Sequence, residues 1–287
     1  MILWLLGAIG LVAAWWAALS TRRTLYPVRR TLAVSRPLPT LEPLSWSSQD
    51  GESFDGWLLS AAPAKGLVVA CHGYYANRLQ LLEIAEGLRL RGYTVILFDL
   101  RGHGTRRGPC TFGVKEAEDL RVILAWVRQQ PALQALPLGF FGMSFGGAVS
   151  VQAAALQGEG RAIVLDSTYA RLFPVLARVI HRDYHLPAVP WAWITWAGVQ
   201  AALGRRLSRR DPAVLAGRCR LPLLHIHGAD DPTVPLAEGT ELYLNWQGPK
   251  ERWVEPGAGH AGTYGTDPGR YVDRAATFFD RWLPEAP

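Results

Sequence analysis

Acidic residues are absent from the first forty positions of this 287-residue chain. The same positions hold five arginines, Arg22, Arg23, Arg29, Arg30 and Arg36, and removing their charge from the net +6 leaves +1 for residues 41–287. Nucleic-acid-binding domains carry their basic excess on the folded body. Because the rest of this chain is nearly neutral, we expect no nucleic-acid partner.

Cysteine is also scarce. Cys71, Cys110 and Cys219 make an odd number, and no two of them form a C-x-x-C pair. This pattern excludes both a disulfide framework and a zinc site of the usual spacing. The sequence shows no other cluster of metal-ligand residues, so we expect no metal.

Charge is missing from the first 21 residues. A helix of about nineteen residues is roughly 28 Å long, close to the hydrocarbon thickness of a bilayer. Trp15 and Trp16 lie toward one end, where aromatic belts occur. We interpret residues 1–20 as a single-pass membrane anchor and residues 21–40, which are basic and contain proline, as a juxtamembrane linker. The arginines favour a cytoplasmic location for the domain that follows.

Two other interpretations compete with this one. A cleaved signal peptide normally begins with basic residues and ends at an A-x-A-like site, and neither is present here. A buried helix of a soluble domain would not be apolar on every face. Whether the segment is cleaved stays open, with the signal peptide as the second choice.

Residues 41–287 alternate between short apolar runs and helical patterns. Two strands joined at Gln49-Asp50-Gly51 predict a hairpin. Strands are then expected at residues 66–71, 93–99, 136–142, 161–166, 221–228 and 251–256, and helices at 77–92, 113–130, 145–157 and 268–283. This alternation predicts an α/β fold, a mostly parallel sheet with helices on both faces. Residues 170–210 interrupt it, are helical in character and contain Trp191, Trp193 and Trp196, so we expect an inserted helical lid.

Gly142-Met143-Ser144-Phe145-Gly146 matches G-x-S-x-G between an expected strand and an expected helix. Ser144 on such a sharp turn would project its hydroxyl into a site, and flanking side chains larger than glycine would collide. The start of the helix would also favour a developing negative charge nearby. We therefore identify Ser144 as a candidate nucleophile rather than part of an ordinary glycine-rich turn.

A serine nucleophile needs a histidine base that an acid orients, and in this kind of fold the chain order is Ser, acid, His. His260 lies in a glycine-rich loop after the last strand and can reach Ser144. The six other histidines are interpreted as bracing, structural or solvated: His72, His103, His181, His185, His225 and His227. The acid is expected after the strand at 221–228, where Asp230 and Asp231 both qualify.

From residue 44 onward the chain resembles the α/β-hydrolase superfamily, with most similarity to its serine-aminopeptidase-like branch. The resemblance lies in "CHGYYANR" (71–78), "FDLRGHG" (98–104), "GMSFGG" (142–147), "HGADDPTVP" (227–235) and "PGAGHAG" (256–262). It implies an α/β-hydrolase fold, and the branch often has an N-terminal membrane anchor.

The resemblance also implies roles for individual residues. Its H-G-x-x-D pattern favours Asp231 as the acid, with Asp166 as an outside candidate and Asp99 as a loop-fixing residue. The backbone N–H groups of Tyr74 and Phe145 would form the oxyanion hole. The implied mechanism proceeds through an acyl-enzyme and requires no cofactor.

We therefore expect a serine hydrolase of carboxylic esters or thioesters, acting on a small-molecule or lipid-like acyl substrate. A peptidase or amidase with the same triad is the alternative, and the basic lid argues against a pocket for a free amino group. A catalytically silent ligand-binding protein of the same fold is the other alternative.

Overall fold

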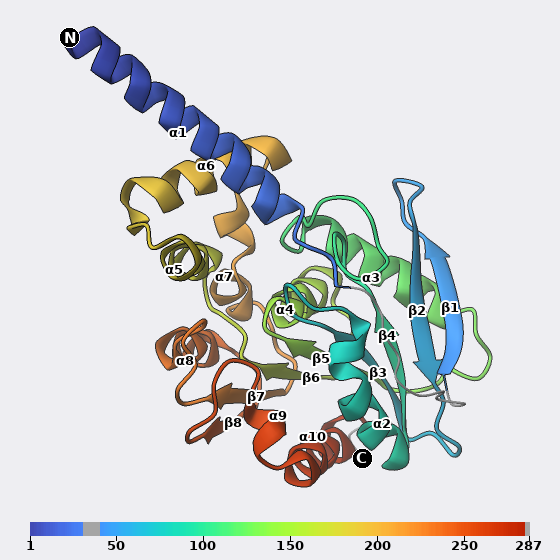
Figure 1. Cartoon of the computed structure of the whole chain (residues 1–287). Helices are drawn as coiled ribbons and strands as arrows, with labels where there is room; N and C mark the ends of the chain where they lie inside the picture. The colour runs from blue at the N-terminus through green and yellow to red at the C-terminus, as the bar shows by residue number, and fades with distance from the viewer. Residues whose placement is uncertain (31–40, 285–287) are drawn as a thin grey trace.

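The computed structural model describes residues 1–30 and 41–284, and its centre is an eight-stranded sheet (Figure 1). The strands lie in the order β1-β2-β4-β3-β5-β6-β7-β8, parallel except for the β1–β2 and β2–β4 pairs. Their bounds are β1 Leu41–Ser47, β2 Ser53–Leu59, β3 Gly66–Cys71, β4 Tyr93–Phe98, β5 Leu138–Met143, β6 Ala162–Asp166, β7 Leu223–Gly228 and β8 Lys250–Glu255.

Strands β3, β4, β6 and β7 are buried along their whole length. Burial of both faces explains their continuous apolar sequences, because each strand packs against helices above and below. β1 and β2 form the predicted hairpin at one edge and alternate more in exposure. The predicted α/β-hydrolase sheet is thus confirmed.

Helices cover both faces of the sheet. One face packs against α3 Val114–Val127, α4 Phe145–Gln157, α7 Pro212–Ala216 and α8 Leu236–Asn245. The other packs against α2 Leu82–Leu90, which follows the 3-10 turn η1 Arg78–Leu81, and α10 Pro268–Trp282. The short α9 Thr263–Thr266 precedes α10. The sequence pattern predicted α2, α3, α4 and α10 but not α7, α8 or α9.

The predicted insertion at 170–210 is present between β6 and β7. It consists of α5 Leu172–Tyr184, η2 Ala188–Ala192, α6 Trp193–Leu203 and η3 Leu207–Arg210. Its tryptophans have different surroundings: Trp196 is buried in the main core and Trp193 is 54% exposed. We call residues 170–210 the lid.

The N-terminal helix α1, Ile2–Leu25, is apolar and long enough to cross a membrane. It projects from the body at its N-terminal end and lies against α6 at its C-terminal end (Figure 1). The expected anchor at residues 1–20 lies within a helix that continues to Leu25, whose side chain is buried in the main core. Residues 31–40 of the predicted linker lie outside the described residues.

Very close packing occurs where α4 begins. A Cβ atom on Gly146 would lie 2.0 Å from the carbonyl oxygen of Cys71, at the end of β3. A Cβ on Gly142 would meet the Cα of Gly147 at 2.4 Å. The glycines therefore let the strand-to-helix turn approach the neighbouring strand, as the sequence predicted.

Replacing Gly146 should test this packing. We expect Gly146→Ala to lower the free energy of unfolding by roughly 2 kcal/mol, because the methyl group would have to displace backbone atoms. Gly265→Ala is the control, since a Cβ there has nothing within 4 Å. Urea unfolding of the full chain in mild detergent measures both variants. Equal stability of the two would contradict the packing argument.

Candidate active site

Ser144 lies between the end of β5 and the start of α4, with φ of 52° and ψ of −117°. This left-handed region is unusual for a residue with a side chain and occurs at constrained, functional turns. The Ser144 backbone N–H donates to the carbonyl oxygen of Asp166 at 2.7 Å, which ties the turn to β6. Burial leaves Ser144 9% exposed, within a cavity that its side chain helps to line.

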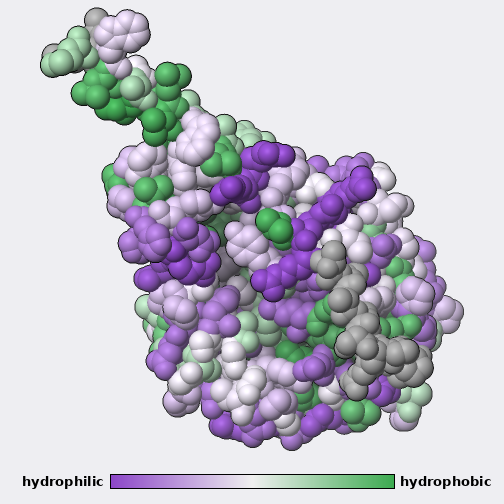
Figure 2. Space-filling model, viewed as in Figure 1, coloured by the Kyte–Doolittle hydropathy of each residue, from purple (hydrophilic) through white to green (hydrophobic). Residues whose placement is uncertain are grey.

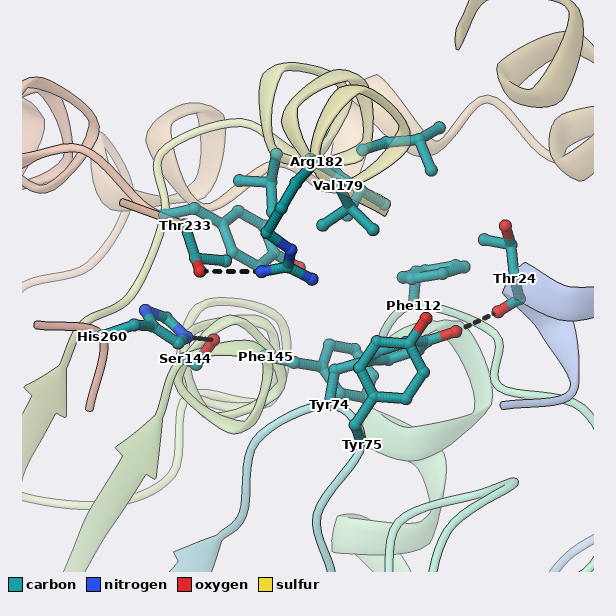
Figure 3. A pocket seen from close by; sticks show the side chains of 14 residues that line it. Thr24, Tyr74, Tyr75, Phe112, Ser144, Phe145, Val179, Arg182, Thr233 and His260 are labelled. Atoms are coloured by element: carbon teal, nitrogen blue, oxygen red, sulfur yellow. Dashed lines mark hydrogen bonds between the residues drawn. The ribbon is translucent and has the colours of Figure 1, made fainter. Parts of the chain in front are cut away.

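His260 joins Ser144 to Asp231. Its Nε2 lies 2.9 Å from the Ser144 hydroxyl (Figure 3), and its Nδ1 lies 2.7 Å from Asp231 Oδ2. When Nδ1 carries the proton and donates it to Asp231, Nε2 is free to accept from Ser144. The structure thus brings together three residues that lie up to 116 positions apart in the sequence.

Backbone donors hold the Asp231 carboxylate in place. Its Oδ1 accepts hydrogen bonds from the N–H groups of Thr233 and Val234, both at 2.8 Å. Asp231 is buried, whereas the neighbouring Asp230 is exposed. Between the two acids that the local sequence left open, only Asp231 contacts His260 in the described structure.

Asp166, the outside candidate, has a different position. Its carboxylate accepts from the Tyr271 hydroxyl at 2.7 Å and from the Ser167 hydroxyl at 2.9 Å. Ser167 Oγ in turn accepts from the backbone N–H of Ala261 at 3.0 Å. Asp166 therefore supports the loop that carries His260 from below, through Ser167. Sequence reasoning missed Ser167 and Tyr271, because only the folded chain brings them to this loop.

The loops around Ser144 are braced by buried polar groups. His72 Nε2 accepts from the N–H of Leu100 at 3.0 Å, and its Nδ1 lies 2.7 Å from the Gly73 carbonyl oxygen. Burial lowers the pKa of His72. Asp99 accepts from the N–H groups of Arg78 and Thr105. Both residues thus lie where a loop-bracing role was expected.

The remaining histidines lie away from Ser144. His103 is buried with Nδ1 2.7 Å from the Arg101 carbonyl oxygen, and burial lowers its pKa to about 3. His225 and His227 are fully buried in β7, and burial lowers the pKa of each. His181 and His185 of the lid are exposed.

Tyr74 and Phe145 flank the nucleophile in space. Phe145 is the first residue of α4, so its N–H has no acceptor within the helix. Tyr74 lies in the loop after β3, and its hydroxyl donates to the carbonyl oxygen of Thr24 in α1 at 2.6 Å (Figure 3). The last turn of α1 thereby fixes the loop that contains Tyr74.

A cavity of about 170 Å³ opens beside Ser144 and His260. Its wall is mainly aromatic and aliphatic, formed by the loop after β3, by α5 and by Thr24 (Figure 3). Arg182 of α5 is the charged residue among the described lining side chains besides the titratable His260, and its guanidinium donates to Thr233 Oγ1 at 3.2 Å. The cavity can hold the apolar part of a substrate whose reacting atom lies within reach of the Ser144 hydroxyl.

The position of Asp166 predicts a pH-dependent stability. Burial raises the pKa of Asp166 from 3.8 to about 6. The folded chain therefore binds this proton more tightly than the unfolded chain, and the stability contributed by the neutral acid is lost as pH rises from about 4 through 6. Measured by urea unfolding, Asp166→Asn should gain stability relative to the natural chain across that window, by about 2–3 kcal/mol in total. A difference that stays constant from pH 4 to 7 would contradict the prediction.

Comparison with known proteins identifies the family. The family described as "Serine aminopeptidase, S33" matches residues 62–212, just over half of the chain. An uncharacterized protein of Mycobacterium tuberculosis (strain H37Rv) is 30% identical over 232 residues, covering 79% of this chain and 75% of that protein. The uncharacterized protein YqkD of Bacillus subtilis is 24% identical over 233 residues, covering 80% and 76%.

Among solved structures, an esterase of Pyrococcus furiosus, Pf2001, superimposes with a TM-score of 0.75. That match has 24% identity and covers 91% of this chain and 99% of the esterase. At this level of identity the likeness shows the shared fold. Taken with the family match and the mycobacterial relative, it establishes that the chain belongs to the S33 serine-aminopeptidase-like family of α/β hydrolases.

Proposed function

We propose that the chain is a serine hydrolase that cleaves carboxylic esters or thioesters with Ser144, His260 and Asp231 as its catalytic triad. The observation that carries this proposal is the unbroken hydrogen-bonded series from Asp231 through His260 to Ser144, which ends in an apolar cavity. The family is a hydrolase family, and the Pyrococcus furiosus neighbour is described as an esterase.

The reaction follows from these positions. Ser144 Oγ attacks the acyl carbon while His260 Nε2 takes the hydroxyl proton, and Asp231 stabilises the imidazolium that forms. The N–H groups of Tyr74 and Phe145 stabilise the oxyanion. His260 returns the proton to the leaving alcohol or thiol. Water then attacks the acyl-enzyme, with His260 again taking a proton, and releases the acid and Ser144.

The lining of the cavity favours an ester over an amino-terminal peptide substrate. Recognition of a free α-amino group requires a nearby carboxylate, because burying an unpaired cation is costly. The described lining contains no Asp or Glu, and its permanently charged side chain is the cation Arg182. Apolar walls instead match an acyl chain. The aminopeptidase activity in the family's description is therefore the second candidate.

The strained backbone at Ser144 argues against a catalytically silent protein. A positive φ at a serine costs free energy of order 1–3 kcal/mol, and such strain is found where function requires it. A binding domain would gain nothing from this conformation. The same turn aims the hydroxyl at His260.

We also propose that α1 anchors the protein in a membrane as a single span, with the hydrolase domain in the cytoplasm. Trp4–Leu25 contains a window of high hydropathy, of which 11% is buried. Arg22, Arg23, Arg29 and Arg30 follow on the side of the domain, and an excess of arginine marks the cytoplasmic flank of a span.

Ester hydrolysis is the direct test of the triad. The full chain in mild detergent should hydrolyse p-nitrophenyl esters from the acetyl to the palmitoyl series. Ser144→Ala and Asp231→Asn should each reduce kcat by roughly 10⁴-fold or more, because each removes part of one proton-transfer unit. Ser53→Ala, at an exposed serine on β2, is the matched control. Natural protein inactive on every ester would overturn the esterase proposal and leave peptide substrates to be tested.

The contact between α1 and the loop after β3 gives a second prediction. Tyr74→Phe keeps the ring and the backbone N–H but removes the bond to Thr24, so the oxyanion donor is held less firmly. We expect kcat to fall about 3- to 10-fold, the equivalent of one hydrogen bond, with KM little changed.

Tyr26→Phe is the control for that measurement. Tyr26 lies just beyond α1, is 55% exposed and has no side-chain hydrogen bond within the described residues. If both variants keep the kcat of the natural protein, the bond from Tyr74 to α1 has no role in positioning the donor.

A further inference from the structure

The outward face of the lid is apolar between Leu186 and Gly204. No charged residue occurs from Leu186 to Gly204. The two polar side chains in that stretch face inward: Thr195 is buried, and Gln200 accepts from the N–H of Leu207. The exposed residues of this stretch are Pro187, Ala188, Val189, Pro190, Trp193, Ala197, Ala201, Ala202 and Gly204. We call them the outer lid face.

The outer lid face belongs to η2 and α6, the part of the lid that packs against α1. Trp16 Nε1 donates to the Trp191 carbonyl oxygen and to Thr195 Oγ1, both at 3.1 Å. The hydroxyls of Ser20 and Thr195 lie 2.8 Å apart. Gly198 of α6 allows close approach, because a Cβ there would meet the Thr21 hydroxyl at 2.1 Å. The second half of α1 and α6 therefore form one packed unit.

The part of α1 that is not packed against α6 is too short to cross a bilayer by itself. The residues from Trp4 to Trp15 are exposed except the half-buried Ala13, and docking begins at the buried Trp16. Residues 2–15 give a helix of about 21 Å, whereas the hydrocarbon core of a bilayer is about 30 Å thick. A spanning α1 therefore brings its docked residues as far as Thr21 into the membrane, and α6 enters the leaflet with them.

Polar residues border the outer lid face at both ends. The imidazole of His185 precedes it, and the charged side chains of Arg205 and Arg206 follow it, all three exposed. Helices that lie in a membrane interface have this arrangement, an apolar face bordered by basic side chains that reach the headgroups. Trp193 is 54% exposed, and tryptophan side chains are enriched at the membrane–water interface. Figure 2 shows hydrophobic residues along the projecting α1 and strongly hydrophilic ones around its base.

We propose that the outer lid face is a membrane-binding surface that is immersed in the lipid leaflet next to α1, with phospholipid acyl chains as its occupant. Lipid is favoured over a second protein chain because the surface is continuous with α1. Trp4, Leu5, Leu6 and Ile9 are all more than half exposed and point to different sides of the helix. A bilayer surrounds such a helix, whereas a single docked partner covers one side. This inference does not depend on the hydrolase activity.

Fluorescence quenching in liposomes tests the proposal. Cys71, Cys110 and Cys219 are buried, so a single introduced cysteine can be labelled selectively with bimane. The full chain carrying Ala197→Cys or Ala201→Cys is reconstituted into phosphatidylcholine liposomes with and without a 5-doxyl lipid. Leu11→Cys on free α1 is the membrane reference, and Leu244→Cys on α8, 66% exposed and distant from α1, is the aqueous reference (Figure 1).

The proposal expects bimane at positions 197 and 201 to be quenched by the doxyl lipid at least half as strongly as at position 11, and to resist iodide. Position 244 should show the reverse. Iodide quenching at 197 and 201 equal to that at 244 would overturn the proposal, since the face would be in water. Protection from both quenchers would also overturn it, because a protein partner such as a second copy would then cover the face.

Discussion

The close contact between the start of α4 and the end of β3 is the constraint on which the site depends. At Gly146 the two backbones are too close for any side chain, since a Cβ would lie 2.0 Å from the Cys71 carbonyl oxygen. β5 lies beside β3 in the sheet, so the chain has to turn sharply at Ser144 to enter α4 there. This one turn strains Ser144, exposes its hydroxyl and brings the first N–H of α4 beside the loop after β3.

Two buried carboxylates of similar chemistry have separate tasks because their surroundings differ. Asp231 receives two backbone N–H groups and the His260 ring, so its charge is compensated beside His260. Asp166 lies deeper, receives two hydroxyls, and has a raised pKa because of burial. Asp231 orients the imidazole of His260, and Asp166 supports the backbone of the loop that contains His260 through Ser167.

Local sequence signals predicted much of the fold and of the candidate site. The features that were not predicted depend on contacts between residues far apart in the sequence. The buried strands and the turn at Ser144 were readable because each is encoded in a few adjacent residues. Helix α8 was missed: Gly239 weakens its helical pattern, yet glycine is needed where a Cβ would meet the His227 ring at 2.5 Å. The packing of α1 on the lid could not be foreseen, because its partners, such as Thr195, lie about 175 residues away. The catalytic roles themselves remain proposals.

Helix α1 and the hydrolase domain are parts of one structure rather than two units joined by a linker. Thr24 contributes both to the wall of the cavity and to the bond that holds Tyr74, while Leu25 is part of the main core. If α1 is fixed in a bilayer at one end, as we propose, it positions the site at the other, with the lid packed beside it. If the lid lies in the leaflet, an acyl chain needs to move only from lipid into an apolar cavity, without crossing water, and the hydrophobic cost of leaving the membrane is largely removed. On this argument a water-soluble fragment that lacks α1 loses part of the wall of its own cavity and the bond that holds Tyr74.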